Sequence, residues 1–203
     1  MTQTNNETTQ AHIFYARFGE EVPNNVSHMI VDDPDTEIPK FTFSFRDQLE
    51  RIKLPEGLKM IGDHAFYMCR KLAEVIFPMT VETIDSYAFS GCHLLKEVKL
   101  PLSLKRINHG AFSGCKSLVI VNLPPSLELI DSKAFFRCTS LLVVHFPKSL
   151  QFIGNSAFAK CHSLIFAELP PTVEVYENAF YKCLTLELRQ LQVDINSLTW
   201  EQK

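Results

Sequence analysis

The sequence predicts a β-rich solenoid, an elongated fold in which similar coils stack on one another. Three observations support this: a sequence pattern that recurs every 23 residues, an alternation of apolar residues typical of a strand within it, and a proline at its end. A fixed period of about 20–50 residues is typical of repeat architectures, in which a single coil cannot bury its apolar face alone. The closing prolines are Pro55, Pro78, Pro101, Pro124, Pro147 and Pro170.

The strand is the element that precedes each of these prolines. In the coil that ends at Pro78, Val75 and Phe77 alternate with other residues and so share one face of a strand. We expect strands of successive coils to form a parallel sheet with a spacing of about 4.8 Å. Proline ends each strand because it lacks the N–H that a sheet ladder needs.

A corner is the next expected element. Gly, Asp and Asn tolerate positive φ, and they occupy the position after an Ile in the middle of the repeat. We therefore predict a tight corner with positive φ at this column: Gly62, Asp85, Asn108, Asp131 and Gly154.

The core is expected from an Ala-Phe pair and a Cys three residues after the Phe, as in Ala111, Phe112 and Cys115. A column of Phe rings would stack at offset aromatic distances. Cys is a small hydrophobe in such a column, and the strand spacing exceeds the Cβ–Cβ distance of about 3.8 Å that a disulfide prefers. We expect free, buried thiols at Cys69, Cys92, Cys115, Cys138, Cys161 and Cys183.

The repeat also sets the predicted boundaries. Subtracting 23 from Phe66 and Val75 gives Phe43 and Ile52, so the pattern extends toward the N-terminus, where Arg46 replaces the Cys. We predict a disordered or cap tail over 1–21 and one solenoid over 22–191, with about six full coils and a degenerate N-terminal coil. A C-terminal cap or tail is predicted over 192–203.

The phrase from Leu127 to Pro147, which includes Ala134-Phe135 and Cys138, resembles the BspA-like leucine-rich repeat. This resemblance covers most of the chain. It implies a leucine-rich repeat horseshoe with one parallel sheet, short turns and little helix. It also implies repeats that mediate protein–protein contact, and it supplies no catalytic residues. Many members of the family are secreted surface proteins, so an adhesin-like binder is an alternative if this chain is exported.

The net charge and the hydropathy of the chain disfavour nucleic acids and membranes as partners. The net charge of −3 disfavours nucleic acid, and no apolar run approaches the roughly 18 residues that span a bilayer. Residues 1–40 hold seven acids and two bases, or −5, which leaves +2 for the remainder. The first ten residues have neither a basic start nor an apolar stretch, so we expect a cytoplasmic protein without membrane contact.

Catalysis is not expected. The sequence contains no glycine-rich phosphate loop, nucleophile elbow or His-Glu-x-x-His, and its cysteines are not spaced as Cys-x-x-Cys. We therefore predict no enzyme activity, cofactor or metal. The rival, a small-molecule or hydrolytic function, would need a deep pocket with convergent polar groups.

The outward positions of the strands carry the functional prediction. They are charged in early coils, as at Arg51 and Glu74, and apolar in later ones. A block of exposed apolar side chains marks an interaction site or a covered surface. We predict that the strand face, expected to be concave, binds another protein through Val119, Ile120, Leu142, Val143, Ile165 and Phe166. The alternatives are self-association through this face, cover by residues 186–203, and a column turned partly inward.

Overall fold

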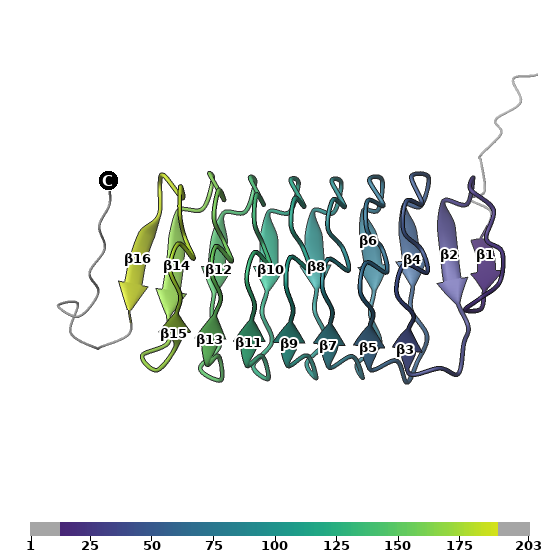
Figure 1. The fold of residues 1–203 in the computed structure, drawn as a ribbon, viewed down its shortest axis with the longest axis horizontal. Coiled ribbons are helices and arrows are strands. Elements are labelled where there is room, and N and C mark those ends of the chain that lie inside the picture. Colours follow the sequence, from purple (N-terminus) through teal and green to yellow (C-terminus); the bar gives the residue numbers. More distant parts are fainter. Residues whose placement is uncertain (1–12, 191–203) are drawn as a thin grey trace, which may run out of the picture.

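Every full coil crosses the molecule twice as a strand, and the coils stack into a prism (Figure 1). The computed structural model describes residues 13–190, and within that range all regular elements are β-strands. All strand pairs are parallel, as stacking of equivalent segments requires. The predicted fold class, a β-rich solenoid, is confirmed.

The longer strands form the predicted strand face. They make a four-stranded sheet ordered β1-β2-β4-β6 and a five-stranded sheet ordered β16-β14-β12-β10-β8. Residues one repeat apart pair directly, as Val98 does with Val121. The strands are β1 (Ile13–Ala16), β2 (His28–Val31), β4 (Arg51–Lys53), β6 (Glu74–Ile76), β8 (Glu97–Lys99), β10 (Ile120–Asn122), β12 (Val143–His145), β14 (Phe166–Leu169) and β16 (Glu187–Gln190).

A second parallel sheet joins the one that was predicted. Six of its seven strands contain the buried Ile of the middle of the repeat, as at Ile84 and Ile107, and the seventh has Val175 there. Two-residue strands are too short to show an alternation in the sequence. They are β3 (Glu37–Ile38), β5 (Met60–Ile61), β7 (Thr83–Ile84), β9 (Arg106–Ile107), β11 (Leu129–Ile130), β13 (Phe152–Ile153) and β15 (Glu174–Val175).

A turn segment forms the third side of the prism. The backbone N–H groups of His64, Phe66 and Met68 donate to carbonyl oxygens of the next coil at 2.9, 2.7 and 2.8 Å. Positive φ occurs here at His64 (55°) and Met68 (59°) and recurs in the other coils. We call this side the turn face.

The corner prediction was wrong. None of Gly62, Asp85, Asn108, Asp131 and Gly154 has positive φ; the left-handed residues lie two and six positions later. Gly62 is small for another reason, because a Cβ there would collide with the backbone oxygen of Ile38 in the preceding coil. Gly154 has the same reason, since a Cβ there would meet the backbone of Ser132, so the two glycines reflect close approach between coils rather than backbone handedness.

The Phe column is the centre of the core, as predicted. Phe112 is fully buried, and its ring centroid lies 5.3 Å from both Phe89 and Phe135 at interplanar angles of 7° and 8°. The neighbouring thiols tie successive coils together, since each Sγ donates to the carbonyl oxygen of a Phe in the coil before it. For Cys115 the acceptor is Phe89, at 3.2 Å.

Both ends of the described chain add strands to the sheets. Strand β1 lies inside the segment predicted as a tail or cap (1–21) and pairs with β2. Arg46, which replaces the Cys in the first coil, donates to Val22 O at 2.6 Å and to Asn24 Oδ1 at 2.7 Å. At the other end β16 pairs with β14, and residues 191–203 lie outside the described range.

Candidate functional site

The predicted binding residues lie on the outer side of the strand face in three successive coils. The residues between them point inward, and Val121 and Ala167 are buried. Ile120 is 50% exposed, Leu142 41% and Ile165 50%. Val119, Val143 and Phe166 are half-buried.

The backbone places these side chains in two adjacent columns. Ile120 pairs with Val143, and Val143 pairs with Phe166. In the neighbouring column, Leu142 N donates to Val119 O at 3.1 Å and Ile165 N donates to Leu142 O at 3.0 Å. The six residues are therefore one contiguous surface, named here the apolar strand patch: Val119, Ile120, Leu142, Val143, Ile165 and Phe166.

Polar residues border this patch. Glu97 pairs with Ile120 on one side, and Glu187 pairs with Phe166 on the other. The next column holds Lys99, Asn122, His145 and Glu168, and the His145 ring lies 6.0 Å from Phe166. In the early coils the same columns carry charge, including an Arg51–Glu74 ion pair at 3.2 Å. An apolar centre with a polar rim is the usual anatomy of a protein interface.

Two of the alternative interpretations can be compared with this geometry. A column turned inward does not fit side chains that are half exposed, such as Ile120 and Ile165. Residues 187–190 extend the sheet edge as β16 rather than crossing the patch. The remaining residues of the proposed covering segment, 191–203, lie outside the described range.

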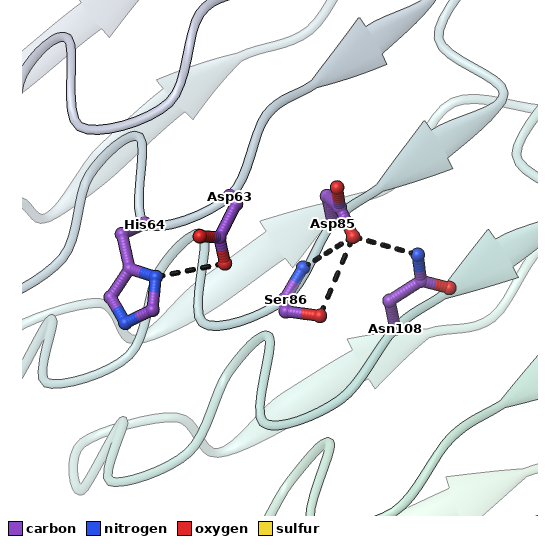
Figure 2. Close-up of polar contacts among 5 residues, drawn as sticks. All are labelled: Asp63, His64, Asp85, Ser86 and Asn108. Atoms are coloured by element: carbon purple, nitrogen blue, oxygen red, sulfur yellow. Dashed lines mark hydrogen bonds and ion pairs between the residues drawn. The ribbon is translucent and has the colours of Figure 1, made fainter.

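A polar cluster lies beside the short strands, away from the strand face. Figure 2 shows Asp85 Oδ1 accepting from Ser86 N at 2.7 Å and from Asn108 Nδ2 at 2.9 Å, while His64 Nδ1 contacts Asp63 Oδ1 at 2.8 Å. The Asn108 bond joins consecutive coils. These contacts hold the coils in register, since the Asp85 carboxylate is used by its own turn and by the next coil.

Residues 13–190 contain no cluster of three His, Cys, Asp or Glu side chains suited to a metal ion, and no helix that could cross a membrane. One open hollow of about 560 Å³ lies at the N-terminal end of the strand face, where Tyr15, Lys53 and Asp32 contribute to its lining. It mixes acidic and basic groups and is separate from the apolar strand patch.

The thiols are free, and all except the half-buried Cys183 are buried. Burial raises the pKa of Cys69 and Cys115 to about 12. It raises the pKa of Cys92 and Cys138 well above the ordinary value. A thiol that stays protonated is a poor nucleophile and a poor metal ligand, so these four thiols contribute packing.

Comparison with known proteins identifies the repeat. A family model described as the BspA type leucine rich repeat region, in six copies, matches residues 22–94 and 59–187. The chain belongs to the BspA-type leucine-rich repeat family. The resemblance seen in the sequence is thus confirmed, and proteins of this family are generally non-catalytic scaffolds.

Solved structures of leucine-rich repeat proteins share the fold. The T. pallidum leucine rich repeat protein TpLRR is 30% identical with a TM-score of 0.79, and the match covers 86% of this chain and 83% of that one. A Bacteroides ovatus leucine-rich repeat protein is 32% identical with a TM-score of 0.72, over 77% of this chain and 41% of that one.

A third match is the pneumococcal vaccine antigen PcpA. It is 25% identical with a TM-score of 0.54, and the match covers 80% of this chain and 50% of that one. A comparison with curated proteins found no match. The coarse assignment is therefore a leucine-rich repeat scaffold of the kind used for protein interaction or as a surface repeat.

Proposed function

We propose that this chain is a non-catalytic protein–protein interaction scaffold that binds a partner protein through the apolar strand patch. The observation that carries the proposal is the patch itself. An outward strand position accepts a polar residue without penalty, and earlier coils place Glu74 and Glu97 there. Large apolar side chains in the equivalent positions of three consecutive coils expose surface that a partner would remove from water.

The test replaces two central patch residues by lysine. Ile120→Lys with Val143→Lys should change the free energy of unfolding by no more than about 0.5 kcal/mol, because surface substitutions have small effects. Partner binding should weaken by about 2 kcal/mol or more, roughly 30-fold in Kd, as expected for a central hot spot. The matched control is Met79→Lys with Leu102→Lys, two residues that are 58% and 60% exposed elsewhere on the molecule.

Affinity capture from an extract of the source organism, followed by isothermal titration of the captured protein, gives the readout. The proposal requires a protein retained by wild type and by the control but lost by the patch variant. Loss of most of the stability in the patch variant would mean that these side chains are covered. The binding proposal would then be abandoned.

Self-association through the same patch is the second candidate. Another copy of the chain would find the same row of apolar side chains, since Ile120 is 50% exposed and pairs with Val143 of the next coil. Analytical ultracentrifugation at micromolar concentration distinguishes the two. If the wild-type chain is a monomer, self-association is excluded. If it is an oligomer and the patch variant is a monomer, binding of a dedicated partner is excluded as the main role.

A cytoplasmic location is part of the proposal, and six free thiols are compatible with a reducing compartment. An exported adhesin-like binder is the alternative, because one similar structure is a vaccine antigen. Fractionation of cells that express the full-length gene product with an epitope tag separates them. Recovery in the medium or on the cell surface would replace the cytoplasmic proposal.

A further inference from the structure

The turn face of the later coils carries a column of cations at backbone positions with left-handed φ. In one middle coil the two left-handed positions are Gly110 and Gly114, with φ of 61° and 72°, whereas an earlier coil has His64 and Met68 there. One repeat after the two glycines they are Lys133 and Arg137, with φ of 58° and 60°. The Arg137 column continues with two more cations in the following coils, Lys160 (63°) and Lys182 (59°).

A column of three cations is unfavourable for folding alone, because like charges repel one another and the coil spacing here is short. The Phe rings of the same coils lie 5.1 Å apart for Phe135–Phe158 and 5.5 Å apart for Phe158–Phe180. The left-handed backbone does not by itself select glycine, since the early coils hold Phe45 and Met68 in the same column.

Aromatic rings hold these cations on the surface. The Arg137 guanidinium carbon lies 5.3 Å from the Phe136 ring centroid, and Lys160 Nζ lies 5.5 Å from the same ring. Lys182 Nζ lies 5.4 Å from the Tyr181 ring. Over the described residues, none of the four cations forms an ion pair with an acidic side chain. We call this set the basic turn patch: Lys133, Phe136, Arg137, Lys160, Tyr181 and Lys182.

We propose that the basic turn patch binds a short acidic peptide segment that lies across the last coils, with its carboxylates facing Arg137, Lys160 and Lys182. Guanidinium groups pair with carboxylates through two parallel hydrogen bonds, and cations steadied over rings need less ordering when a ligand arrives. The three-cation column spans about 10 Å, which an extended peptide covers with about three or four residues.

A peptide fits this surface better than a nucleic acid. The patch is short, and the whole chain has a net charge of −3, which disfavours a long polyanion. The inference concerns a different face from the apolar strand patch and does not depend on it.

The experiment measures fluorescence anisotropy of fluorescein-labelled hexaglutamate with the full-length chain, and with hexa-uridine RNA in parallel. The glycine variant combines Arg137→Gly, Lys160→Gly and Lys182→Gly, residues that match glycines in the middle coils. The charge-matched control combines Lys53→Gln, Lys96→Gln and Lys99→Gln on the strand side. A variant with Gln at positions 137, 160 and 182 serves if the glycine variant does not fold.

Wild type and the strand-side control should bind hexaglutamate, and the glycine variant should bind about tenfold or more weakly. Raising the salt from about 50 to 200 mM should weaken wild-type binding, since exposed charges are screened. The proposal is overturned if wild type does not bind, if the strand-side control weakens equally, or if RNA binds at least as tightly through the same residues. Sedimentation that shows a patch-dependent oligomer would assign the surface to a second copy instead.

Discussion

The stacked Phe column supports the sharpest quantitative prediction about stability. Replacing Phe112 by Ala removes a ring that is fully buried and lies between two parallel rings at 5.3 Å. Truncation of a buried Phe costs about 3–5 kcal/mol, since it removes apolar contact and leaves a cavity. Each lost aromatic pair adds about 0.5–1.5 kcal/mol beyond burial, which favours the upper part of that range.

The loss of global stability should depend on where in the stack the removed ring lies. Phe180 stands at the C-terminal end of the described column, is 8% exposed, stacks on Phe158 at 5.5 Å and meets Phe146 edge-on at 6.3 Å. Because a solenoid coil depends on its neighbours, we expect Phe180→Ala to loosen the last coil and to reduce global stability less than Phe112→Ala. Phe45, which is 61% exposed, provides the surface control.

Urea titration followed by far-ultraviolet circular dichroism measures the three variants against wild type. Phe112→Ala should lower the midpoint most, and Phe45→Ala should lower it least. A loss of unfolding free energy below about 1 kcal/mol for Phe112→Ala would refute the reasoning, because removing a ring from a filled core costs more than that. Equal losses at all three sites would contradict the dependence on position.

Two further predictions concern the thiols and the N-terminal cap. Burial raises the pKa of Cys115 from 9.0 to about 12, so stability should fall as pH rises from about 9 to 12, because only the unfolded chain loses this proton. Between about pH 8 and pH 10.5, urea titration should show Cys115→Ala losing about 2 kcal/mol less stability than wild type, since the effect grows by about 1.4 kcal/mol per pH unit only above about pH 9; equal losses would contradict this. Arg46→Ala removes the bonds to Val22 O and Asn24 Oδ1, so amide exchange in the first coil should accelerate. Arg70→Ala, which loses only an exposed pair at 3.8 Å, should leave that exchange unchanged, and equal effects would reject a capping role.

The core could be predicted because its signals are local and repeated. Phe112, Cys115 and their equivalents recur in phase, and a residue at the same place in every coil has the same surroundings. The outward direction of Ile120 and Val143 followed from period-2 alternation in a strand. Their roughly half-exposed state required no information beyond the phase.

The second sheet and the handedness of the turns could not be obtained this way. A two-residue strand such as Thr83–Ile84 has no periodicity of its own, and it forms because adjacent coils offer ladder partners. The prediction of positive φ at the corner column failed for a related reason. Gly62 is required by the carbonyl of Ile38, which approaches it from another coil, and a chain position alone does not reveal that neighbour.

The amino-acid sequence by itself determined the period, the stacked core and the family. Each coil of a solenoid has the same local environment, so the same residue pattern recurs in every repeat. Only the tertiary structure decided which surface residues meet. Arg137, Lys160 and Lys182 are 22 or 23 residues apart and become neighbours because stacking places equivalent turns about 5 Å from one another. Lys160 lies over the Phe136 ring of the preceding coil, a contact that no single repeat encodes, whereas Arg137 and Lys182 each lie over the ring of the residue before them.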